Sequence, residues 1–92
     1  MEKLYIIESK YYQHGVIFNE RKRYTTSAEN ANKIYEETLE AFKNDCSDML
    51  EDKENYSINK GNRKRRRYFL CFYKYQPEAS GFCVEMWTEN LE

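Results

Sequence analysis

The sequence predicts an α+β domain in which a small antiparallel sheet packs on one long helix. Segments rich in Ile, Tyr and Phe lie in pairs near both ends of the chain, and short runs of turn-forming residues separate the members of each pair. Between the two pairs, apolar residues recur at helical spacing over about five turns. The 92 residues fit a single domain, residues 1–92, with the element order ββαββ.

The first pair of strands is expected over residues 3–12 and from residue 16 onward. Residues 4–7 are apolar at every position, which is typical of a central strand that is covered on both faces. The sequence Gln-His-Gly at 13–15 indicates the turn between the two strands. The second strand could extend to residue 24, although Asn-Glu-Arg-Lys at 19–22 could itself form a turn.

The long helix is expected to run from about residue 27 to about residue 52. Thr26 and Glu29 have the spacing of a capping box, in which each side chain binds a free backbone N–H of the first turn. The apolar stripe that would face the sheet consists of Ala31, Ile34, Tyr35, Leu39, Phe42, Cys46, Met49 and Leu50.

The second pair of strands is expected over residues 65–76 and 82–88. Residues 53–63 are rich in turn formers and are expected to form a loop, and Pro77 begins the hairpin connection, which ends at Gly81. If Tyr75 lies opposite Gly81, one face of this hairpin is the more aliphatic of the two and should pack on the helix. That face carries Tyr68, Leu70, Phe72, Lys74, Phe82, Val84, Met86 and Thr88. The open face then carries Phe69 directly opposite Trp87, together with Tyr73.

Charge is distributed unevenly along the chain. The 15 basic and 16 acidic residues give a net charge of -1, which indicates no particular partner. Residues 27–56, however, hold nine acids and three bases, whereas residues 57–75 hold seven bases and no acid. Such segregation creates local potentials that steer charged partners.

The composition indicates a non-enzymatic protein of the cytoplasm. Three cysteines cannot all pair within the chain, and no leader peptide and no membrane-spanning apolar stretch is visible. Cys71 and Cys83 lie near each other on the expected hairpin, but no second His completes a metal site. One His, no nucleophile motif and no phosphate-binding glycine loop argue against catalysis, so we expect neither a metal nor a cofactor.

A run of cations that leads into the third strand is one candidate binding surface. Positive side chains of this kind bind phosphates, and the aromatic rings of the open face could stack on unpaired bases. The alternative interpretation is a solvated loop whose charges discourage pairing of strand edges. The basic candidates are Arg21, Lys22, Arg23, Lys60, Arg63, Lys64, Arg65, Arg66 and Arg67. The aromatic candidates are Phe69, Tyr73 and Trp87.

The polar side of the expected helix is a second candidate surface. Its carboxylates could imitate the phosphates of a nucleic acid and dock in the groove of a nucleic-acid-binding protein. The alternative interpretation is an ordinary solvated helix face. The acidic candidates are Glu36, Glu37, Glu40, Asp48 and Glu51.

In size and composition the chain is similar to small accessory proteins of phages and mobile elements, which include anti-CRISPR and other anti-defence inhibitors. The likeness rests on a short domain that is rich in Lys, Glu, Asn and Tyr and carries no catalytic motif. It implies stoichiometric inhibition of a host nucleoprotein or nuclease through one of the two candidate surfaces. Two alternatives stay open: a domain that binds DNA or RNA directly through residues 63–67, and an assembly protein that forms a homodimer through an edge strand or the open aromatic face.

Overall fold

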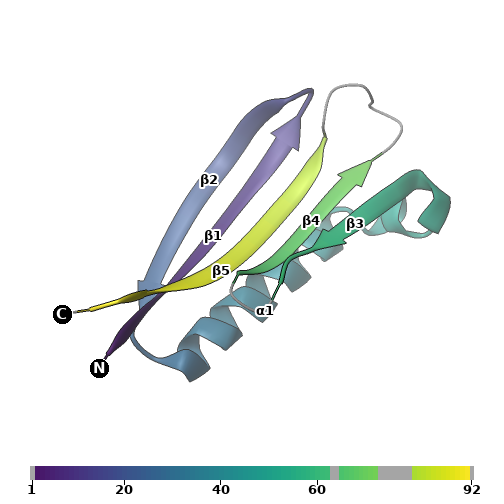
Figure 1. Cartoon of the computed structure of the whole chain (residues 1–92). Coiled ribbons are helices and arrows are strands. Elements are labelled where there is room, and N and C mark those ends of the chain that lie inside the picture. The colour runs from purple at the N-terminus through teal and green to yellow at the C-terminus, as the bar shows by residue number, and fades with distance from the viewer. Residues whose placement is uncertain (1, 63–64, 73–79, 92) are drawn as a thin grey trace.

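The computed structural model describes residues 2–62, 65–72 and 80–91, and it confirms the α+β class. One antiparallel sheet of five strands, in the order β2-β1-β5-β4-β3, carries a single helix, α1, on one face (Figure 1). The elements are β1 (Lys3–Gln13), β2 (Val16–Thr25), α1 (Ala28–Asp45), β3 (Tyr56–Lys60), β4 (Arg66–Phe72) and β5 (Gly81–Asn90). The strand β3 was not expected from the sequence.

The hairpin of β1 and β2 has the two-residue turn that the sequence indicates. Gln13 pairs with Val16, and the two residues between them, His14 and Gly15, have φ values of 51° and 80°. A two-residue turn with both φ angles positive matches the right-handed twist of the strands that it joins. β2 is continuous to Thr25, so no second turn interrupts it, but its register with β1 shifts near Asn19, which has φ of 51°.

The helix is shorter than expected, and its cap is one residue further along the chain. The Oγ of Ser27, not the side chain of Thr26, accepts a hydrogen bond from the N–H of Asn30 at 3.2 Å. α1 ends at Asp45, and two short 3₁₀ turns, Ser47–Leu50 and Lys53–Asn55, follow it. A helix to residue 52 was therefore wrong, although Met49 and Leu50 still pack against the core as the apolar stripe predicted.

The unexpected strand β3 occupies part of the segment that was predicted to be a loop. Its side chains are half-buried or exposed, as the 41% exposed fraction of Ile58 illustrates. What forms it is pairing with β4, together with an edge-on contact between the rings of Tyr56 and Phe72 at 6.4 Å. A short edge strand of this kind depends on its neighbour more than on its own propensity.

The hairpin of β4 and β5 has a different register from the expected one. Tyr68, not Phe72, lies opposite Val84, which is a displacement of four residues. A displacement by an even number leaves every side chain on its expected face, because strand side chains alternate with a period of two. Gly81 starts β5, and a Cβ at this residue would lie 1.8 Å from the carbonyl oxygen of Leu70. The remainder of the expected strand and its connection, residues 73–79, lies outside the described residues.

The core lies between α1 and the face of the sheet that α1 covers. β5 is the middle strand and supplies two of the completely buried apolar side chains there, Phe82 and Val84. Each large apolar side chain that is fully buried contributes about 1.5–3 kcal/mol to folding. The buried cluster consists of Ile7, Ala31, Tyr35, Leu39, Leu70, Phe72, Phe82 and Val84. The prediction that Leu70, Phe72 and Val84 face the helix is thereby confirmed.

Candidate binding surfaces

A row of charged side chains crosses the outer face of the sheet, which is the face turned away from α1. Strand pairing places Lys22 of β2 opposite Glu8 of β1, and Glu8 opposite Glu85 of β5. Glu85 in turn lies opposite Arg67 of β4. Both carboxylates are largely withdrawn from water, with exposed fractions of 8% for Glu8 and 9% for Glu85. These four residues are called the charge row below.

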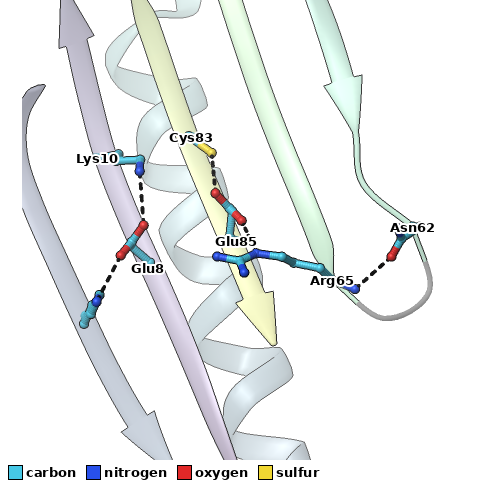
Figure 2. Close-up of polar contacts among 7 residues, drawn as sticks. Glu8, Lys10, Asn62, Arg65, Cys83 and Glu85 are labelled. Atoms are coloured by element: carbon cyan, nitrogen blue, oxygen red, sulfur yellow. Dashed lines mark hydrogen bonds and ion pairs between the residues drawn. The ribbon is translucent and has the colours of Figure 1, made fainter. Parts of the chain in front are cut away.

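Each carboxylate of the charge row is held by cations. The Nζ of Lys10 donates to one oxygen of Glu8 at 3.2 Å, and the Nζ of Lys22 lies 3.5 Å from the other oxygen. The Nε of Arg65 donates to Glu85 at 2.6 Å (Figure 2). Like charges on directly opposed residues repel, so these cations are what allows two carboxylates to face each other across β1 and β5.

The titration behaviour of this region reflects the same contacts. Burial alone would raise the pKa of Glu85, but the hydrogen bond from Arg65 and the charges of Arg65 and Arg67 outweigh it and lower the pKa. Burial raises the pKa of the Cys83 thiol to about 11, and the adjacent Glu85 adds to the effect. The Cys83 thiol lies 3.6 Å from a Glu85 oxygen (Figure 2). Cys83 is therefore a neutral thiol at physiological pH.

The basic run does not form one continuous positive surface. Arg65 and Arg67 lie on the outer face, whereas Arg66 points to the helix side, where it binds Glu36 and donates to Asn32 at 3.1 Å. Arg65 is bound by Glu85, so Arg65 and Arg66 are both paired with the protein's own carboxylates. Arg63 and Lys64 lie outside the described residues. The described arginines of the basic run therefore do not form the single positive surface that the sequence predicted.

The second basic cluster is likewise divided between the two faces. Lys22 belongs to the charge row, while Arg21 and Arg23 lie on the helix side because side chains alternate along β2. Both arginines line an open groove of about 380 Å³ between β2 and α1, in which Glu37 lies on the helix wall. The second basic cluster therefore does not join the basic run as a unit, because only Lys22 shares the outer face with Arg65 and Arg67.

Phe69 and Trp87 lie on the outer face as expected, but they are not opposite each other. Phe69 faces Cys83, and Trp87 lies four residues further along β5, a separation of roughly 13 Å. The guanidinium groups of Arg67 and Arg65 lie over these rings, 5.2 Å and 4.2 Å from the respective ring centres. Both rings are half-buried, Phe69 beneath Arg67 and Trp87 beneath Arg65. The third aromatic candidate, Tyr73, lies outside the described residues.

The acidic candidates are exposed to solvent, and two of them lie close to arginines. Glu36 is bound by Arg66, and Glu37 lines the groove that holds Arg21 and Arg23. The others, Glu40, Asp48 and Glu51, are exposed on α1 and the turn that follows it. None of these three forms an ion pair with any residue that the structure describes. They are called the acidic ridge below.

A pocket of about 380 Å³ lies between α1 and residues 60–62 at the end of β3, and no pattern in the sequence indicates it. Lys60 is one of the basic candidates from the sequence, whereas Lys43 on α1 is not. The structure brings them together, because Lys60 pairs with Tyr68, and the ammonium of Lys43 lies 4.9 Å from the centre of the Tyr68 ring. Arg66 lines the same pocket.

Two further observations concern the described residues as a set. No three side chains of His, Cys, Asp or Glu among them lie together in a way that could hold a metal ion. No helix in the described ranges has both the length and the apolar character needed to cross a bilayer.

Comparison of the chain with protein-family models, with curated proteins and with solved structures gives no match.

Proposed function

We propose that the protein is a non-enzymatic binding module of the cytoplasm that inhibits or regulates a host nucleoprotein, in the manner of phage and mobile-element anti-defence proteins. The docking surface in this proposal is the acidic ridge. It would occupy the positively charged groove in which the partner normally holds nucleic acid, and thereby exclude the nucleic acid.

One observation carries the choice of surface. The described arginines 65 and 66 are bound by the protein's own carboxylates, whereas the acidic ridge has no cationic partner among the described residues. Unpaired exposed charges are available to a partner without first breaking an internal contact, and they accelerate encounter with a surface of opposite sign. On the outer face, Arg65 would have to give up its ion pair with Glu85 before it could bind a partner in the same way.

The proposal is tested by displacement of nucleic acid from candidate partners. Purified DNA-binding effectors, such as CRISPR effector complexes and restriction nucleases, would be loaded with labelled DNA and titrated with the protein. The ridge variant is Glu40→Gln/Asp48→Asn/Glu51→Gln. The matched control, Glu2→Gln/Glu20→Gln/Glu89→Gln, removes three exposed acids elsewhere and gives the same net charge.

The wild type and the control should displace DNA alike, and the ridge variant should need about 5- to 100-fold more protein, since an exposed charge pair contributes up to about 1 kcal/mol. Equal potency of the two variants would assign the effect to net charge and reject the ridge. Failure of the wild type to displace DNA from any effector in the panel would reject the function.

The homodimer alternative has one observation in its favour. β2 is a ten-residue edge strand, and four of its large apolar side chains are 45–58% exposed: Val16, Ile17, Phe18 and Tyr24. Such an edge can pair with a second copy, although the irregularity near Asn19 interrupts it. Light scattering should then give a dimer mass that Ile17→Lys converts to the monomer mass. A monomer at all concentrations rejects this alternative.

A further inference from the structure

The pocket between α1 and residues 60–62 has an excess of positive charge. Its basic lining residues are Lys43 of α1, Lys60 of β3, and Arg66 and Arg67 of β4, so three separate elements converge on it. The guanidinium of Arg67 lies over the Phe69 ring on the outer face, so the cationic groups on the helix side are those of Lys43, Lys60 and Arg66. Glu36 is the carboxylate among its described lining residues, and Arg66 binds it. Two lysine charges therefore remain, because neither Lys43 nor Lys60 forms an ion pair with a described residue.

Aromatic rings hold two of the cations, Lys43 and Arg66, in position. Lys43 lies over the ring of Tyr68, and the guanidinium of Arg66 lies 4.0 Å from the centre of the Tyr35 ring. An aromatic face attracts a cation through its quadrupole but contributes no net negative charge. The rings thus orient these side chains while leaving the charge of Lys43 available. Fixing the side chains in advance lowers the entropy cost of binding a ligand there.

The backbone closes one wall of the pocket. The N–H of Gly61 donates to the carbonyl oxygen of Arg67 at 3.2 Å, and the side chain of Asn62 accepts from the N–H of Arg65 at 3.1 Å. A Cβ at residue 61 would lie 2.2 Å from the carbonyl oxygen of Arg65, so only glycine allows the turn to close this tightly. Lys60 lies opposite Tyr68 in the pairing of β3 with β4, on the face of the sheet that α1 covers.

We propose that this pocket binds a phosphate group, either of a nucleotide or of a nucleic-acid backbone. Lysine ammonium groups bind phosphate as point charges, and the two that remain unpaired here suit one phosphate or two successive ones. The carboxylate in the described lining that competes with phosphate is Glu36, which Arg66 binds, and no residue of the acidic ridge lines the pocket. The pocket is independent of the docking surface in the proposed function, so either proposal can fail without the other.

The test compares two double variants of the full chain. Lys43→Gln/Lys60→Gln removes the two pocket lysines, and Lys33→Gln/Lys53→Gln removes two exposed lysines outside the pocket. The probes are inorganic phosphate, adenosine monophosphate and a fluorescent single-stranded oligothymidine. Binding is followed by NMR shifts and by fluorescence anisotropy in about 0.05 M salt, and unfolding temperatures show that both variants are folded.

We expect the pocket variant to lose binding of the small phosphates. It should bind the oligonucleotide roughly 60-fold more weakly, since counterion release contributes about eightfold for each phosphate contact at this salt concentration. The control variant should bind the small phosphates like the wild type. Tighter, salt-dependent binding of oligothymidine identifies a nucleic-acid backbone, and binding of the small phosphates alone identifies a nucleotide; either result supports the pocket. Equal weakening in both variants, or no binding of any probe by the wild type, overturns it.

Discussion

Replacing Glu85 by Gln tests whether the charge row stabilises the sheet. The change keeps the shape of the side chain but removes the charge that holds Arg65 and lies opposite Arg67. A hydrogen bond to a charged group contributes about 1.5–3 kcal/mol, and breaking a fully buried ion pair costs about 3–5 kcal/mol. The Arg65 side chain is 52% exposed, so water can solvate it again and the lower range applies.

Relief of repulsion acts in the opposite direction, because Glu8 lies directly across from Glu85. Glu8 is already bound by two lysines, so the repulsion that Gln would relieve is small compared with the lost contact to Arg65. We expect Glu85→Gln to lower the free energy of unfolding by about 2 kcal/mol, and the midpoint of thermal unfolding by about 8–16 °C. Glu89→Gln, at an exposed position of the same strand, should change stability by less than about 0.5 kcal/mol.

The pH dependence of the stability difference between the wild type and Glu85→Gln shows whether the Glu85 charge causes it. Folding lowers the pKa of Glu85 from its ordinary value of 4.5, so the carboxylate stabilises the fold above that pH and loses its contribution as the pH falls through the folded-state pKa. Denaturant unfolding of the wild type and Glu85→Gln should therefore differ fully at about pH 6 and converge in acid. If the variant is as stable as the wild type at about pH 6, or if the difference does not depend on pH, the reasoning about the charge row is refuted.

Three further predictions concern single residues. Gly81→Ala places a Cβ 1.8 Å from a carbonyl oxygen of the facing strand and should lower the free energy of unfolding by roughly 3 kcal/mol or more. Gly15→Ala, at φ of 80° in open space, should lower it by about 1 kcal/mol. Equal losses of stability in thermal unfolding would contradict the observed register. Ser27→Ala should lower the free energy of unfolding by about 1 kcal/mol, and Thr26→Ala by less than about 0.5 kcal/mol. The reverse order in denaturant unfolding would identify Thr26 as the helix cap, as expected from the sequence. Cys83, with its pKa raised to about 11 by burial, should be the slowest cysteine to react with iodoacetamide in the native protein at about pH 8, as mass spectrometry would show; rapid modification would place it nearer the surface.

The faces of the last hairpin could be predicted from sequence, but its register could not. Alternation with a period of two assigns Leu70 and Phe72 to the same side in either register, so the prediction of faces survived a displacement of four residues. The register depends on the role of Gly81, which suits a turn and a close strand contact equally well. Its approach to Leu70 is a tertiary contact that no local pattern records.

The charge row and the cationic pocket could not be predicted from local patterns either. Glu8 and Glu85 meet only because the first and the last strands pair, across 77 residues of sequence. The pairing of Glu8 with Lys22 additionally depends on the irregularity near Asn19. Lys43 joins Lys60 because an unexpected strand forms next to β4. In each case single charges were visible in the sequence, but their neighbours are set by the topology.

The order of the strands has a consequence for synthesis on the ribosome. β5 is the middle of the sheet, yet it follows every other described element in the chain, and its neighbour β1 precedes them all (Figure 1). The nascent β1–β2 hairpin therefore emerges with an unpaired edge and keeps it until β5 has been translated. Pairing over such a distance is slow to form. For that interval the newly made segment is exposed to chaperones and to aggregation, and acquisition of the native state must follow translation of β5.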